Sequence, residues 1–157
     1  MGVGKTSTAK ALAEALGWPM RDSDADIESA SGRTGAALVR EVGVCRLHRY
    51  EADVLTAALS GDEATVVAAA GWVVEDPECR RLMTERSRVA VLDLDIGELM
   101  TRIASGDHRR PMTEAELRSA ASRRSVLFDE VATWRLDARQ STVELVAQVA
   151  ADVRGTT

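Results

Sequence analysis

The residues most able to do chemistry stand at the beginning of the chain, where positions 2–7 combine two glycines with a lysine, a threonine and a serine. The run Gly4-Lys5-Thr6 matches the close of the pattern G-x-x-x-x-G-K-[ST]. Glycines let backbone N–H groups turn toward phosphate oxygens, a lysine ammonium bridges the β and γ phosphates, and a threonine hydroxyl ligates Mg²⁺. The alternative is a glycine-rich helix start that binds nothing.

This pattern predicts a binding site for ATP and Mg²⁺. Lys5 is also predicted to be catalytic, and Thr6 is also predicted to be a metal ligand. The residues predicted to bind the nucleotide in this segment are Gly2, Val3, Gly4, Lys5, Thr6 and Ser7.

A helix is expected to follow the loop directly, because the apolar residues at positions 9–16 recur with a 3.6-residue period and Gly17 ends the pattern. In doubly wound α/β proteins such a loop follows a strand in the middle of the sheet. The first glycine of the pattern would lie upstream of Met1. We therefore expect Met1 to be an internal methionine of a longer natural protein whose first, central strand precedes it. An in-frame stop codon directly before Met1 would contradict this expectation.

Extended and helical segments alternate along the rest of the chain, which indicates a parallel sheet with helices on both faces. The segments expected to be extended are 18–21, 66–70, 89–94 and 132–136. A second helix is expected to end at 31, and the segment 34–59 is expected to form two helices interrupted at Gly43. The remaining helices are expected at 77–83, 96–104, 113–130 and 141–153. The predicted fold class is α/β, a three-layer sandwich of the P-loop NTPase type.

Composition narrows the possible partners. The 157 residues are 45% hydrophobic, which suits a single domain over 1–157 with one core. A net charge of -5 argues against a nucleic-acid-binding surface, because phosphate backbones attract clusters of Lys and Arg. No apolar run approaches the roughly 20 residues that cross a bilayer, and Cys45 and Cys79 are too few for a disulfide framework. We expect a cytoplasmic monomer with a small-molecule partner, without nucleic acid or membrane.

With an acidic segment after the first helix, the order of motifs resembles the shikimate kinase family over nearly the whole chain. That family's loop often reads G-x-M-G-x-G-K-[ST], so Met1 fits the residue before Gly2. Its D-x-D-x-x-I-E pattern is matched by Asp22, Asp24, Ile27 and Glu28, and its T-G-x-[ST] helix junction resembles residues 31–34. The resemblance implies an ATP-dependent kinase that transfers the γ-phosphate to a hydroxyl of shikimate, a precursor of aromatic amino acids.

The resemblance also implies roles for the acidic pair. Asp24 would bind ring hydroxyls of the substrate and orient the attacking one, which makes it both catalytic and substrate-binding. Asp22 would hold the Mg²⁺ shell through water. A carboxylate suits both roles, because it only accepts hydrogen bonds when ionised and can draw a proton from a hydroxyl. The alternative is a helix cap with solvated acids. The helices between about 24 and 59 would then bind the acceptor.

Two arginines complete the implied site. The loop at about 105–113 resembles a lid over the nucleotide, in which Arg110 before Pro111 matches the family's R-P. Arg110 would contact the transferring phosphate, because a guanidinium fork matches charge spread over three oxygens. Arg124 aligns with the family's R-x-x-x-Y helix, whose arginine binds the substrate carboxylate. The alternative for each arginine is a solvated surface charge.

Two positions depart from the family pattern. The family's F-R-x-x-E corresponds to residues 47–51, which place His48 where an arginine would grip the substrate carboxylate. A neutral imidazole cannot form that bidentate pair, unless Arg49 replaces it or His48 is protonated. Of three family glycines beneath the substrate ring only Gly71 remains, and Trp72 follows it, either packing in the core or reshaping the acceptor pocket. The predicted substrate-binding residues are Asp24, His48, Arg49, Gly71 and Arg124.

Three functions are compatible with these residues. The first is a shikimate kinase, which the intact set of Lys5, Thr6, Asp24 and Arg110 favours. The second is a kinase of another small hydroxy acid or polyol, as in the related gluconate kinases. The third is a nucleotide-binding protein of the same fold that has lost turnover. The altered acceptor positions keep the second and third functions open.

Overall fold

The computed structural model describes residues 2–104 and 113–155. Helices in these ranges are α1 (Lys5–Leu16), α2 (Ser23–Ser31), α3 (Gly35–Val42), α4 (Val44–Leu59), α5 (Pro77–Arg86), α6 (Ile96–Ala104), α7 (Glu114–Val131), α8 (Thr142–Gly155) and the short 3-10 helix η1 (Val73–Glu75). Strands in these ranges are β1 (Met20–Asp22), β2 (Val66–Ala68), β3 (Val89–Asp93) and β4 (Ala132–Asp137).

The bounds of these elements agree closely with those predicted from the sequence. The helix expected at 5–16 has those bounds, and Gly43 separates α3 from α4 as expected. The strand expected at 66–70 already ends at Ala68, because the chain turns there into η1, which the sequence analysis did not predict. The difference falls beside the expected acceptor site.

The strands pair in parallel, as predicted. In one pair β1 lies beside β2, with Asp22 next to Ala68; in the other β3 lies beside β4, with Asp93 next to Asp137. Within the described residues these pairs form two two-stranded sheets rather than one continuous sheet. The additional strand expected before Met1 stays a prediction.

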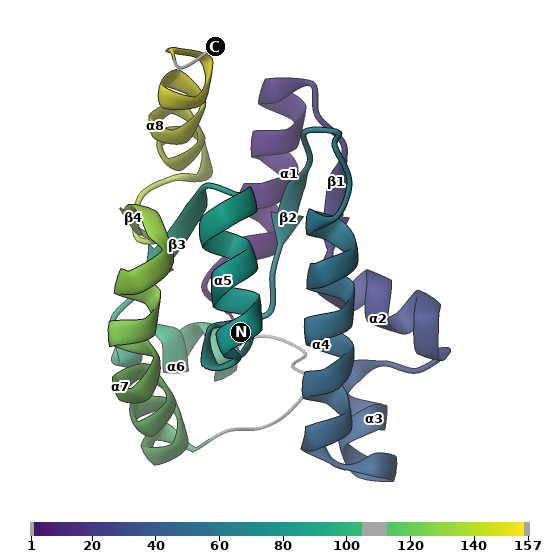
Figure 1. Cartoon of the computed structure of the whole chain (residues 1–157). Helices are drawn as coiled ribbons and strands as arrows, with labels where there is room; N and C mark the ends of the chain where they lie inside the picture. Colours follow the sequence, from purple (N-terminus) through teal and green to yellow (C-terminus); the bar gives the residue numbers. More distant parts are fainter. Residues whose placement is uncertain (1, 105–112, 156–157) are drawn as a thin grey trace.

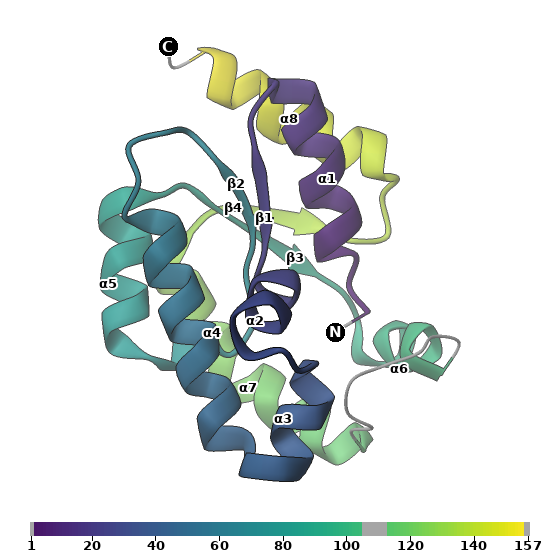
Figure 2. The same ribbon diagram turned by 90° about the vertical axis from the view of Figure 1, so that its right-hand side faces the viewer.

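Helices cover the strands from both sides. Figure 2 shows β1 and β2 between α1 on one side and α4 and α5 on the other. Figure 1 shows α4, α5 and α7 side by side, while α1 and α8 lie together at the end of the molecule where the chain finishes. This is the α/β arrangement that the alternating sequence pattern predicted.

Apolar side chains hold these layers together in several clusters. The largest joins α4, η1, α5 and α7, and its buried members are Leu55, Val73, Val74, Cys79, Met83 and Val131. A second joins α1 to β2 through Ala9, Ala13, Val66 and Ala68. Because α1 packs on β2 through small residues, the start of α1 is fixed close to the ends of β1 and β2.

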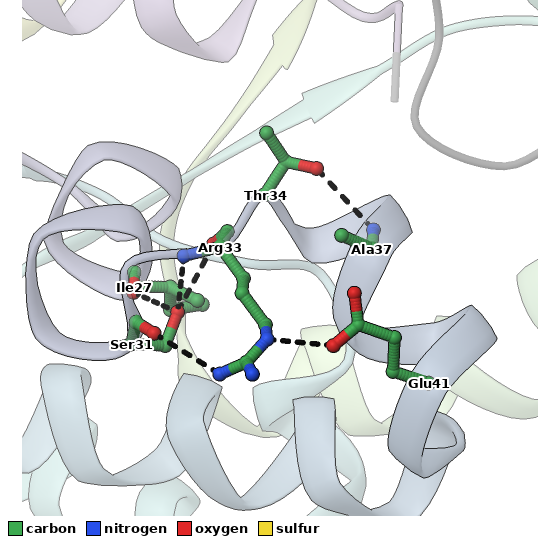
Figure 3. A network of polar contacts seen from close by, with 6 residues as sticks. All are labelled: Ile27, Ser31, Arg33, Thr34, Ala37 and Glu41. Atoms are coloured by element: carbon green, nitrogen blue, oxygen red, sulfur yellow. Dashed lines mark hydrogen bonds and ion pairs between the residues drawn. The ribbon is translucent and has the colours of Figure 1, made fainter.

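The turn between α2 and α3 is fixed by polar contacts, drawn in Figure 3. The hydroxyl of Ser31 donates to the carbonyl of Ile27 at 2.7 Å and accepts from the N–H of Arg33 at 3.1 Å. Arg33 in turn donates through Nε to Glu41 at 2.6 Å, and Thr34 caps α3 by accepting from the N–H of Ala37 at 3.3 Å. The helix junction expected at residues 31–34 is therefore present, and its contacts fix the start of α3 relative to the end of α2.

None of the helices within the described ranges is long and apolar enough to span a bilayer.

Candidate functional site

The expected phosphate loop opens α1. Gly4 is the N-cap residue of α1 with φ +95°, and Gly2 has φ +68°, both in the left-handed region that favours glycine. A Cβ on Gly2 would also lie 3.2 Å from Cγ1 of Ile103 and 3.3 Å from Cδ1 of Leu99, so α6 packs against the loop. The first N–H groups of α1 have no partner within the helix, which suits binding of phosphate oxygens.

The two predicted metal ligands lie in direct contact. The hydroxyl of Thr6 at the start of α1 donates to Oδ2 of Asp22 at 2.8 Å. The other oxygen of Asp22 accepts from the N–H of Asp24 at 2.9 Å and caps α2. Asp22 is thus a helix cap, as the alternative interpretation proposed, and it also reaches the phosphate loop. Asp22 thereby links the backbone of Asp24 to the phosphate loop.

The Thr6 and Asp22 pair fits a magnesium ion chemically. Mg²⁺ in proteins is usually held by one or two side-chain oxygens, with the remaining positions filled by water and substrate phosphates. Residues 2–104 and 113–155 contain no group of three or more His, Cys, Asp or Glu side chains that could hold a metal ion. One hydroxyl and one carboxylate beside a phosphate loop agree with the shared coordination that Mg²⁺ prefers.

The helix α4 contributes a buried carboxylate, Glu51. Glu51 of α4 is only 7% exposed, and its Oε2 has no hydrogen-bond partner among the described residues. Burial raises the pKa of Glu51 from 4.5 to about 7, against the opposing effect of the positive charges of Arg124 and Lys5. Lys5 of the phosphate loop and Arg124 of α7 are therefore both close enough to act on the same carboxylate.

This burial predicts a pH-dependent stability. The unfolded chain ionises Glu51 near pH 4.5 and the folded chain near pH 7, so the folded state binds more protons in between and stability falls as pH rises. At about 1.4 kcal/mol per pKa unit, ionisation of Glu51 lowers the free energy of unfolding by up to about 3 kcal/mol above pH 7. Glu51→Gln is expected to remove this loss. Urea unfolding at pH 5 and pH 8.5 should show the variant gaining clearly more on the parent protein at the higher pH.

The exposed Glu63, changed to glutamine, is the matched control and should shift stability equally at both pH values. An equal difference between Glu51→Gln and the parent protein at pH 5 and pH 8.5 would contradict the assignment.

Arg124 and Gly71, both predicted to bind the substrate, lie together. A Cβ on Gly71 would lie 3.8 Å from Nη1 of Arg124. Arg124 donates through Nε to Oε1 of Glu75 at 2.5 Å, and both side chains are about one-quarter exposed, at 24% and 25%. Sequence reasoning missed Glu75, since no motif signals it and 49 positions separate it from Arg124.

His48 and Trp72 form a parallel aromatic stack. Their ring centroids are 4.0 Å apart and their planes differ by 7°. Both line a cavity of about 380 Å³ between α4 and the start of α5, together with the exposed residue Arg49. Trp72 lines this cavity and belongs to none of the described apolar clusters, whereas Gly71 and Arg124 do not line the cavity.

The structure thus brings several of the predicted residues together in small groups. Thr6, Asp22 and Asp24 form one connected group, and Gly71 and Arg124 form another, while the positive charges of Arg124 and Lys5 both act on Glu51. Arg110 and the expected lid up to residue 112 lie outside the described residues.

A glycine-capped phosphate loop at the start of a helix, an acidic residue bonded to its threonine, and parallel strands between helices define a P-loop nucleotide-binding protein. The family model for shikimate kinase matches residues 1–154. The chain therefore belongs to the shikimate kinase family, whose members are phosphotransferases that use ATP and an alcohol acceptor.

Individual relatives agree with this assignment. The chain is 33% identical to a shikimate kinase of Symbiobacterium thermophilum over 95% of this chain and 89% of that protein, and 31% identical to one of Xanthomonas euvesicatoria over 98% and 90%. Among solved structures, shikimate kinase from Acinetobacter baumannii in complex with shikimate superposes with a TM-score of 0.90 at 27% identity, covering 100% of this chain and 90% of that one. The P-loop kinase fold predicted from the sequence is confirmed.

Proposed function

We propose that this protein transfers the γ-phosphate of ATP to a hydroxyl of shikimate. Membership of the shikimate kinase family supports this function. The observation that carries it is the hydrogen bond between Thr6 and Asp22, because it joins the phosphate loop to the acidic segment expected to bind metal and acceptor. A nucleotide and a hydroxyl substrate could therefore meet at one place.

On the nucleotide side, the N–H groups after Gly2, Val3 and Gly4 would bind phosphate oxygens together with Ser7. The ammonium of Lys5 would bridge the β and γ phosphates and follow the charge as it moves to the leaving oxygen. Magnesium, held by Thr6 directly and by Asp22 through water, would neutralise charge on the phosphates. Arg110 is proposed to contact the transferring phosphate from the lid at about 105–113.

On the acceptor side, the proposed binding residues come from α2, α4, the turn before η1 and α7. Asp24 would accept a hydrogen bond from the attacking hydroxyl and draw its proton. Gly71 permits close approach to the backbone, and Arg124 beside it would bind the substrate carboxylate. His48 and Arg49 are also proposed to bind the substrate; they line the cavity beside Trp72, where His48 presents a ring stacked on Trp72 instead of a guanidinium.

The single domain, the monomeric state and the cytoplasmic location stay predictions from composition. The absence of nucleic-acid and membrane partners is likewise a prediction, based on the net charge of -5 and the apolar pattern.

A coupled assay of ADP release tests the proposal. Purified protein with ATP and Mg²⁺ should release ADP faster when shikimate is added, and phosphorylated shikimate should accumulate in equal amount. Omitting Mg²⁺ by adding a chelator should abolish the shikimate-dependent rate. Unchanged ADP release with and without shikimate, from protein shown to be folded, would reject the function.

A further inference from the structure

The contact between Glu75 and Arg124 has a specific geometry. Glu75 ends η1, the short helix that follows Gly71 and Trp72, and Arg124 lies on α7. Glu75 accepts from Nε of Arg124 at 2.5 Å, which is one side edge of the guanidinium. The neighbouring Nη1 lies 3.8 Å from the position of a Cβ on Gly71. One edge of the guanidinium is therefore held by the protein, while Nη1 lies beside the turn that contains Gly71.

A guanidinium can serve two carboxylates at once, because its five N–H donors lie in one plane along different edges. A carboxylate on Nε fixes that plane and leaves the Nη groups for a second, bidentate partner. Both side chains are about one-quarter exposed, so water screens the attraction between Glu75 and Arg124. The negative charge of Glu75 therefore weakens the binding of a second anion to Arg124 only modestly. The larger effect of Glu75 is on the orientation of Arg124.

We infer that Glu75 is a positioning residue that holds Arg124 in the orientation needed to bind the acceptor's carboxylate at the Gly71 turn. The inference rests on the proposed function, and specifically on the proposed role of Arg124. It adds a residue that no family motif in the sequence indicates. Because His48 is stacked on Trp72, orientation of Arg124 carries a larger part of carboxylate recognition in this protein.

Two substitutions separate orientation from charge. Glu75→Ala removes the acceptor for Nε, and is expected to raise KM for shikimate about tenfold while KM for ATP stays unchanged. Glu75→Gln keeps an oxygen acceptor but no charge, and is expected to restore KM for shikimate to within about twofold to threefold of the parent protein. Arg123→Ala is the matched control, since exposed Arg123 approaches the same carboxylate only at 4.0 Å and should leave both KM values unchanged.

A second ligand tests whether the effect acts through the acceptor's charge. With shikimate carboxamide, which lacks the carboxylate, Glu75→Ala and the parent protein should show the same KM. Any of three results would overturn the inference. Glu75→Ala and the parent protein could have the same KM for shikimate, both Glu75 variants could have a lower KM for shikimate, or KM for ATP could rise in parallel. If the parent protein itself showed no shikimate-dependent ADP release, the proposed function would be rejected instead.

Discussion

Replacing Lys5 by methionine is expected to lower kcat for phosphoryl transfer by about 10²–10³-fold, equivalent to about 3–4 kcal/mol of transition-state stabilisation. Methionine keeps the length and much of the volume of the side chain but removes its positive charge. The site would then lose the cation that follows negative charge from the γ-phosphate to the leaving oxygen. Steady-state ADP release at saturating ATP and shikimate measures the effect.

Lys10 provides the matched control for this experiment. It is the other lysine of the chain, lies in the same helix α1 and is exposed. Lys10→Met should therefore keep kcat within about twofold of the parent value, as is usual for surface substitutions. If Lys5→Met kept more than half of the parent kcat while Lys10→Met behaved the same way, the phosphate-loop assignment would be wrong.

Much of the fold could be predicted because local patterns determine it. The apolar period and Gly17 define α1 without reference to the rest of the chain, and Gly43 divides α3 from α4. Parallel pairing also followed from the alternation of strands and helices. The division into two strand pairs was not predicted, because it depends on which strands hydrogen-bond to each other across the fold.

The candidate site also has features that the sequence predicted and features that it did not. Thr6 and Asp22 belong to recognisable motifs, so their chemistry was predicted, and the structure adds that they touch at 2.8 Å. The stack of His48 on Trp72 and the pairing of Arg124 with Glu75 join residues from different elements. Neither pair has a fixed spacing that a motif could encode. Such contacts depend on how α4, η1 and α7 pack, which the sequence pattern alone does not specify.

Glu51 shows what the structure adds to a motif residue. The pattern F-R-x-x-E includes it as part of the acceptor region, but its unpartnered oxygen and raised pKa follow only from burial. In the family pattern an arginine stands three residues earlier, one helical turn away, where this chain has His48. Replacing a guanidinium by a stacked imidazole therefore leaves Glu51 with Lys5 and Arg124 as the cations that lower its pKa.

Asp24→Asn is expected to reduce kcat by about 10²–10³-fold, within the range of a lost general base. Asparagine has nearly the same shape, and the N–H of residue 24 can still donate to Asp22, so α2 keeps its cap. An amide cannot draw a proton from the attacking hydroxyl, although it can still hydrogen-bond to it. The loss should therefore appear mainly in kcat, with KM for ATP unchanged.

Glu28→Gln makes the same carboxylate-to-amide change at an exposed position of α2 and should leave kcat unaltered. Nucleotide binding by Asp24→Asn, measured by calorimetry with Mg²⁺ and ATP, should match that of the parent protein, which separates lost chemistry from a damaged fold. A kcat within about threefold of the parent in Asp24→Asn would assign Asp24 to positioning alone. Phosphoryl transfer would then depend on Lys5, magnesium and the lid, because a loose transition state needs charge stabilisation more than it needs a base.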